Sequence, residues 1–123
     1  MAIPKILGIS GSLREASFNT QLMKAAIASY GTADVEIADL NLPLYDGDLE
    51  AKGIPEMVTK LGAQIAAADM LIVASPEYNK GISGVLKNAL DWASRVPGTV
   101  FAAKPTLLIG AAAGRTGGET AYF

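Results

Sequence analysis

Four short apolar runs, each bounded by turn residues, recur along the chain at intervals of about 30 residues. The runs are Lys5–Ser10 (KILGIS), Val35–Asp39 (VEIAD), Met70–Ser75 (MLIVAS) and Thr106–Ala111 (TLLIGA). Short runs rich in branched apolar residues predict β-strands, and two of the four lack the polar alternation of a strand with one solvated face. We therefore predict four strands, two of them buried on both faces.

Helical patterns fill the three intervals between these runs. They cover Phe18–Tyr30, Pro55–Ala68 and approximately Ser83–Arg95. In the third, Leu90 and Trp92 belong to the apolar stripe that we expect to face the core. The resulting order β-α-β-α-β-α-β is typical of right-handed crossovers in a parallel sheet and predicts a single α/β domain over residues 1–123. The segment Asn41–Gly53 is the longest piece that we expect to be irregular.

The 123-residue chain contains no cysteine and no histidine, which excludes several kinds of chemistry. A thiolate nucleophile, a disulfide framework, a Ser-His-Asp relay and an imidazole-bound metal all need one of these side chains. The net charge of −2 gives no reason to expect binding to nucleic acid or to an anionic membrane. No apolar run approaches the ~20 residues of a membrane span and the first residues do not form a signal peptide, so we expect a cytoplasmic protein.

Ligands of open parallel sheets bind beyond the carboxyl ends of the strands, so three loops are candidates for a site. The first loop, Ser10–Asn19, combines hydroxyl groups, the Arg14 guanidinium and the N-terminus of a predicted helix. Oriented N–H groups beside a fixed positive charge predict a cradle for one phosphate group. The alternative is an ordinary polar turn in which Ser17 caps the helix. The glycine spacing fits neither a dinucleotide-binding fingerprint nor a Walker A loop.

The other two loops offer surfaces for a planar ring. Pro76–Gly81 (PEYNKG) carries Tyr78 and Asn79, which provide a flat face and amide hydrogen bonds suited to a heterocycle. The alternative is an ordinary turn with an exposed tyrosine. Gly110–Gly118 (GAAAGRTGG) has little side-chain bulk, so its backbone N–H groups are free to approach a ring or a sugar.

The remaining charged residues are interpreted as structural. Lys87 and Asp91 lie four residues apart on a predicted helix and form an exposed pair. Four acidic residues could be taken for a metal cluster, but their spacing matches no known loop, and we interpret them as a solvated face: Asp39, Asp46, Asp48 and Glu50. We predict no metal site.

With these motifs in view, the chain resembles the NADPH-dependent FMN reductase family of the flavodoxin-like fold, which includes quinone and chromate reductases. The matching pieces are Gly11-Ser12-Leu13-Arg14-x-x-Ser17-x-Asn19, Pro76-Glu77-Tyr78-Asn79, Leu86-Lys87-Asn88-Ala89-Leu90-Asp91-Trp92 and Gly117-Gly118. They occur in the family's order and spacing, and together they span essentially the whole chain.

The resemblance implies a doubly wound parallel sheet, flavodoxin-like, with strand order 2-1-3-4. Family members have five strands in the order 2-1-3-4-5, so a fifth strand and about a third of a typical member are expected to be absent here. The fourth strand would then be an apolar edge, which we expect either to reflect truncation or to be covered by a partner.

The resemblance also implies FMN as the cofactor and assigns a site to it. The first loop would hold the FMN phosphate through Ser10, Ser12, Arg14, Ser17 and Asn19, with Phe18 also in the cofactor site. The isoalloxazine ring and ribityl chain would be lined by Pro76, Glu77, Tyr78 and Asn79. The other side of the ring would be closed by the loop that contains Ala111, Ala112 and Gly114. Family members often carry serine at the positions of Ala111 and Ala112, so one hydroxyl contact would be missing.

The activity implied by the resemblance is transfer of a hydride from NADPH or NADH, through the flavin, to a small-molecule electron acceptor. A quinone is the first expectation; azo compounds, chromate and free flavin are alternatives. No side chain need act as a catalytic acid or base, because the cofactor carries the redox chemistry. Two rival interpretations are a flavodoxin-type electron carrier without enzymatic activity and a fragment impaired in folding. A homodimer or homotetramer is expected, with no nucleic acid or membrane as partner.

Overall fold

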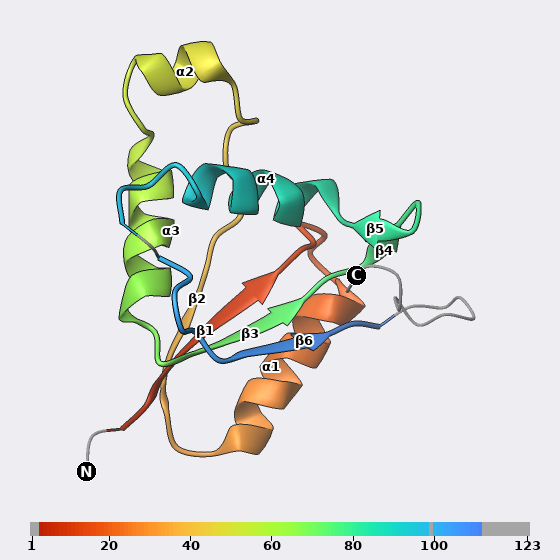
Figure 1. Ribbon diagram of the computed structural model, residues 1–123. Helices are drawn as coiled ribbons and strands as arrows, with labels where there is room; N and C mark the ends of the chain where they lie inside the picture. The colour runs from red at the N-terminus through yellow and green to blue at the C-terminus, as the bar shows by residue number, and fades with distance from the viewer. Residues whose placement is uncertain (1–2, 99, 112–123) are drawn as a thin grey trace.

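Four parallel strands form the central sheet of the computed structural model, which describes residues 3–98 and 100–111 (Figure 1). The strand order is β2-β1-β3-β6, so the predicted order 2-1-3-4 is confirmed. The strands are β1 (Lys5–Ser10), β2 (Asp34–Ile37), β3 (Met70–Ala74) and β6 (Thr106–Ile109). Each pairs in parallel register with its neighbour, so all four carboxyl ends meet at one edge of the sheet.

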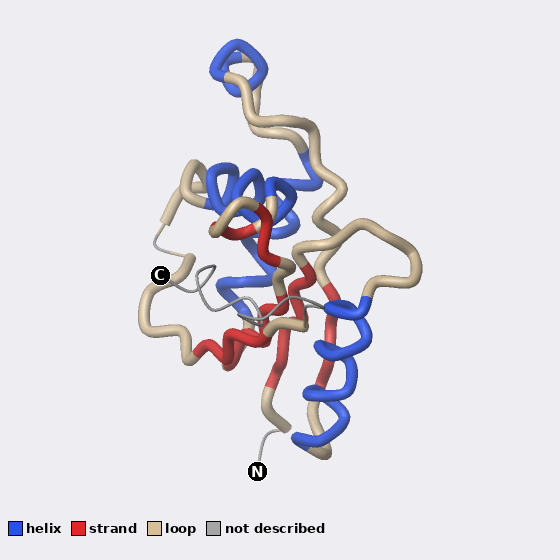
Figure 2. Tube along the Cα trace, turned by 90° about the vertical axis from the view of Figure 1, so that its right-hand side faces the viewer, coloured by secondary structure: helices blue, strands red, loops and turns tan. Residues whose placement is uncertain are grey.

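Three long helices cover the two faces of this sheet. They are α1 (Phe18–Tyr30), α3 (Glu56–Ala67) and α4 (Gly84–Ala93). Helix α1 lies on one face, and α3 and α4 lie on the other, with the sheet between them (Figure 2). The predicted helices are therefore confirmed, with α1 matching at both ends. None of the helices in the described part of the chain is long and apolar enough to cross a membrane.

The two central strands contribute to a separate apolar core on each face. Ile6 of β1 packs with Met23 and Ile27 of α1, whereas Leu7 and Ile9 face the cluster beneath α3 and α4. Successive side chains of a strand point to opposite faces, which explains why β1 has no polar alternation. Burying each such side chain contributes about 1.5–3 kcal/mol. The edge strands differ: every residue of β2 and most of β6 are exposed.

Two short elements are absent from the sequence-based prediction. Helix α2 (Gly47–Ala51) lies within the segment that was expected to be irregular, so that expectation is wrong for five residues. Asp46 caps this helix, because its carboxylate accepts a hydrogen bond from the Asp48 N–H at 2.9 Å. The loop after β3 contains a hairpin of two two-residue strands, β4 (Glu77–Tyr78) and β5 (Gly81–Ile82).

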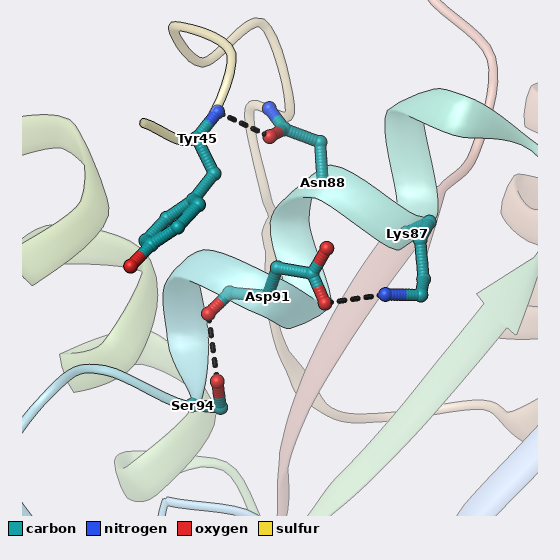
Figure 3. A network of polar contacts seen from close by, with 5 residues as sticks. All are labelled: Tyr45, Lys87, Asn88, Asp91 and Ser94. Carbon is teal, nitrogen blue, oxygen red and sulfur yellow. Dashed lines mark hydrogen bonds and ion pairs between the residues drawn. The ribbon is translucent and has the colours of Figure 1, made fainter. Parts of the chain in front are cut away.

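An arm formed by residues 41–53 carries α2 away from the body of the domain (Figure 1) and is held at its base by α4. The backbone N–H of Tyr45 donates to Asn88 Oδ1 at 2.8 Å, as Figure 3 shows. The indole N–H of Trp92 donates to the Pro43 carbonyl at 2.7 Å, and the Tyr45 ring meets the Trp92 ring edge-on. Trp92 is fully buried, which confirms that it belongs to the core. The neighbouring Leu90 is exposed, so its expected inward orientation is wrong.

An ion pair and a tyrosine fix the far end of this arm. Arg95 Nε donates to Glu50 Oε2 at 2.7 Å, and the Tyr45 hydroxyl donates to Glu50 Oε1 at 2.8 Å. The hydrogen bond from Arg95, together with that from Tyr45, lowers the pKa of Glu50 below its ordinary value. The bond to Glu50 in turn raises the pKa of Tyr45. Glu50 is thus a structural anchor, and the prediction that it belongs to a solvated face is wrong.

Candidate functional site

Three loops lie at the carboxyl edge of the sheet, the edge that also carries the start of α1 and the β4–β5 hairpin (Figure 1). We call residues 11–17, between β1 and α1, the phosphate loop, and residues 75–83, between β3 and α4, the ring loop. The third loop follows β6, and the structure describes it through Ala111. The predicted site residues Ala112 and Gly114, and the motif Gly117-Gly118, lie outside the described residues.

The phosphate loop leads into a helix start with free N–H groups. The Ser17 side chain caps α1 by accepting a hydrogen bond from the Thr20 N–H at 3.2 Å, which confirms its capping role. Within the described part of the chain, the N–H groups of Phe18 and Asn19 have no protein acceptor. They are therefore available to an anion, and the helix dipole favours negative charge at the same place.

Arg14 supplies the fixed positive charge of this loop. Its side chain is exposed, and no carboxylate among the described residues forms an ion pair with it. A guanidinium without an ion-pair partner among the described residues and free N–H groups a few residues further along the chain are donors that suit a phosphate monoester. The arrangement thus fits one phosphate group.

Two serine hydroxyls, one at the end of β1 and one in the phosphate loop, shape the backbone of this loop. Ser10 Oγ lies 2.7 Å from Thr20 Oγ1 and accepts a hydrogen bond from the Ser12 N–H at 3.3 Å. Ser12 Oγ in turn accepts from the Arg14 N–H at 3.3 Å. These contacts hold the loop in a curve around the start of α1. Thr20 was missed by sequence reasoning, because it lies inside the helical pattern.

Buried serines join the phosphate loop to the ring loop. Ser83 Oγ donates to the Gly11 carbonyl at 2.6 Å, and the Ser83 N–H donates to Ser75 Oγ at 3.3 Å. Ser75 Oγ donates to the Pro76 carbonyl at 2.8 Å. A side chain at Gly11 would not fit, because its Cβ would lie 2.7 Å from Ser83 Oγ. Sequence reasoning placed Ser83 and Ser75 only at the ends of a helix and a strand.

A second link joins the start of α1 to the third loop. Asn19 Nδ2 donates to the Ala111 carbonyl at 3.2 Å, and Asn19 Oδ1 accepts from the Ala111 N–H at 3.0 Å. Asn19 is only 5% exposed. Two residues predicted for the same site are thus brought into direct contact. The Asn19 side chain is engaged by the protein, so its backbone N–H is the group left for a ligand.

The ring loop presents a flat aromatic face at its hairpin. Tyr78 is 59% exposed, whereas Pro76 and Glu77 are half-buried. Asn79 and Lys80 both have positive φ, at 52° and 61°, as in the type I′ turn that suits a two-residue hairpin. The hairpin therefore has a defined shape, and the Tyr78 ring is available to a planar ligand.

An apolar cavity of about 260 Å³ lies apart from the phosphate loop, between α4 and β6. Its lining includes Val73, Leu86, Leu90, Phe101 and Leu108, and the ring loop contributes Ser75 and Ile82. This lining offers no charged group to a phosphate. The described residues also contain no group of three or more acidic side chains that could hold a metal ion.

The family model for NADPH-dependent FMN reductases matches residues 4–122. The chain belongs to this family. It is 47% identical over 121 residues to an NAD(P)H-dependent FMN reductase of Pseudomonas aeruginosa, covering 97% of this chain and 65% of that protein. It is 44% identical over 124 residues to an NADPH:quinone oxidoreductase of Arabidopsis thaliana, covering 96% and 63% of the two chains.

A solved structure agrees with these sequence relationships. The flavoenzyme NAD(P)H:(acceptor) oxidoreductase FerB from Paracoccus denitrificans superposes with a TM-score of 0.84 at 34% identity. The match covers 97% of this chain and 66% of that protein. The flavodoxin-like fold is thus shown for this chain, which spans about two thirds of the length of these three proteins.

Proposed function

We propose that this protein is an FMN-dependent NAD(P)H oxidoreductase that reduces quinones or similar small-molecule acceptors. The observation that carries the proposal is the donor set at the start of α1, where the free N–H groups of Phe18 and Asn19 lie in the same loop region as the unpaired Arg14. The relatives support it, because their names are those of FMN and quinone reductases.

The residues of the three loops fit FMN. Arg14 and the N–H groups at the start of α1 would hold its phosphate, and the hydroxyl groups of Ser10, Ser12 and Ser17 would keep the loop in shape or contact the phosphate. The exposed face of Tyr78, with Pro76, Glu77 and Asn79 beside it, would line the ring and the ribityl chain. When bound, FMN would supply the redox chemistry that links oxidation of NADPH or NADH to reduction of the acceptor.

The protein's own part in this reaction is binding and orientation. No side chain need act as a general acid, because solvent can supply the protons of the reduced product. Backbone N–H groups of the ring loop would stabilise negative charge that develops on the ring. Azo compounds, chromate and free flavin are further acceptors in the proposal.

The test is oxidation of NADPH and NADH by the purified chain with added FMN, in the presence and absence of a benzoquinone. We expect oxidation that depends on both the quinone and FMN. Arg14→Ala, assayed over the same range of FMN concentrations, should require more FMN for half-maximal rate. Wild-type chain that binds FMN but gives no quinone-dependent oxidation would contradict the proposed reaction.

We further propose that the protein is a homodimer or homotetramer. Leu107 and Leu108 of the edge strand β6 are 45% and 49% exposed, and an exposed apolar edge favours association. Light scattering at micromolar concentration should give twice or four times the mass of one chain. A monomer under those conditions would contradict this proposal.

A further inference from the structure

A single buried side chain connects the two loops that would hold opposite ends of FMN. Ser83 is 1% exposed, and its hydroxyl makes two hydrogen bonds in opposite directions. It donates to the Gly11 carbonyl of the phosphate loop at 2.6 Å and accepts from the Leu86 N–H of α4 at 3.1 Å. The same hydroxyl group therefore caps α4 and forms a hydrogen bond to the phosphate loop, 72 residues away in sequence.

Ser83 and Gly11 are each held by further hydrogen bonds and lie close together. Ser83 also donates its backbone N–H to Ser75 Oγ, and Gly11 donates its own N–H to the Ala74 carbonyl at 2.7 Å. A Cβ on Gly11 would lie 3.1 Å from Ser75 Oγ as well as 2.7 Å from Ser83 Oγ. The phosphate loop and the ring loop thus touch through buried groups, and none of the buried side-chain polar atoms described lacks a hydrogen-bond partner. A junction of this kind resists relative movement of the two loops.

We propose that Ser83 is a positioning residue that fixes the spacing between the phosphate loop and the β4–β5 hairpin, and so determines how strongly the chain prefers FMN to riboflavin. This inference rests on the proposed FMN site. Each half of that site has its own support, because Ser17 caps α1 and the hairpin has its own strand pairing. Ser83 holds these two halves, the phosphate loop and the hairpin, at a fixed separation.

The physical reason is preorganisation. A ligand that binds at both ends benefits from each end only when the two subsites are held at the right separation. FMN has a ring and a phosphate, whereas riboflavin has the ring and no phosphate. Loosening the junction therefore weakens FMN binding and leaves riboflavin binding nearly unchanged.

The test measures the dissociation constants of FMN and riboflavin by fluorescence quenching, for the wild-type chain and for Ser83→Ala. We expect the preference for FMN, the ratio of the riboflavin and FMN dissociation constants, to fall about tenfold in Ser83→Ala. This is the size expected when the loss of one buried hydrogen bond weakens the binding of FMN and not that of riboflavin. Ser83→Thr keeps the hydroxyl and should restore the preference. Ser94→Ala is the matched control: Ser94 Oγ donates to the Asp91 carbonyl at the other end of α4, as Figure 3 shows, and the preference should not change.

The outcomes separate the inference from the function on which it rests. Wild-type chain that binds neither ligand would overturn both. Wild-type chain that prefers FMN, with the same preference in a folded Ser83→Ala variant, would overturn the positioning role alone. A parallel loss of affinity for both ligands would assign Ser83 a merely structural role and overturn the inference.

If Ser83→Ala does not give a cooperative thermal transition, Ser75→Ala tests the same junction, because it removes the acceptor of the Ser83 N–H. A smaller fall in the same preference is then expected, and an unchanged preference would overturn the inference.

Discussion

Truncating Asn19 is expected to release the start of α1 from the end of β6. The Asn19 side chain makes two hydrogen bonds to the backbone of Ala111, at 3.2 Å and 3.0 Å. In Asn19→Ala both bonds disappear, and the N–H and carbonyl of Ala111 lose their partners. The contact joins residues 92 positions apart, so no local interaction replaces it.

The expected loss in the free energy of unfolding is about 2 kcal/mol. Each intramolecular hydrogen bond contributes about 0.5–1.5 kcal/mol net, and two are lost here. Ala111 is half-buried, so water can form hydrogen bonds with its freed N–H and carbonyl groups. The loss in the free energy of unfolding is therefore smaller than the full cost of leaving two buried groups without a partner. The sheet and both cores are untouched by this change, so the variant should still fold.

Urea denaturation followed by circular dichroism measures this loss. For a domain of this size, 2 kcal/mol corresponds to a fall in the unfolding midpoint of about 1 M urea, with the slope of the transition unchanged. Asn41→Ala is the matched control, because the exposed Asn41 side chain makes no hydrogen bond to the described residues. A loss for Asn19→Ala within about 0.5 kcal/mol of that control, the size of ordinary surface substitutions, would refute the reasoning.

Three further predictions follow from other contacts. Arg14→Ala should weaken FMN binding by about 2 kcal/mol, or roughly 30-fold, through loss of a charge-assisted phosphate contact, with stability unchanged; unchanged affinity in a fluorescence titration would remove Arg14 from the cradle. The lowered pKa of Glu50 means that its contribution to stability is complete above the ordinary carboxyl pKa and is lost as the pH falls through the lowered value. The melting temperatures of wild type and Glu50→Gln should therefore differ at neutral pH and converge in acid, and a difference that does not depend on pH would contradict this. Lys104→Met should lower the free energy of unfolding by about 1 kcal/mol in urea, because the Lys104 ammonium donates to the Ala66 and Ala68 carbonyls at the end of α3; no change would show that this cap is unimportant.

The sheet and its long helices could be predicted from the sequence because both depend on periodicity. Strands β1 and β3 are buried on both faces and read as continuous apolar runs, and α1 has a clear helical repeat. The short elements lack such a signal. Helix α2 is held by its Asp46 cap and by the Glu50–Arg95 ion pair, and the β4–β5 hairpin by a turn with the sequence Asn-Lys, whereas Asn-Gly is the usual signal.

The candidate site was predictable in its loops and less so in its side chains. Motif resemblance brought Asn19 and Ala111 to one site, but only the fold shows that they bind each other. Ser83 stood at the predicted start of a helix, but its contact with Gly11 depends on how the strands are ordered. Leu90 was expected in the core, yet it lines the apolar cavity beside β6 and stays exposed there. Contacts between distant segments decide each of these cases.

The central claim is that the three loops of this chain form an FMN site, and titration of FMN with the purified chain tests it most directly. We predict that flavin fluorescence is quenched with a stoichiometry of one FMN per chain. We also predict that binding is tighter for FMN than for riboflavin. Fluorescence that stays at the level of free FMN, with a chain that shows a cooperative thermal transition, would contradict the claim.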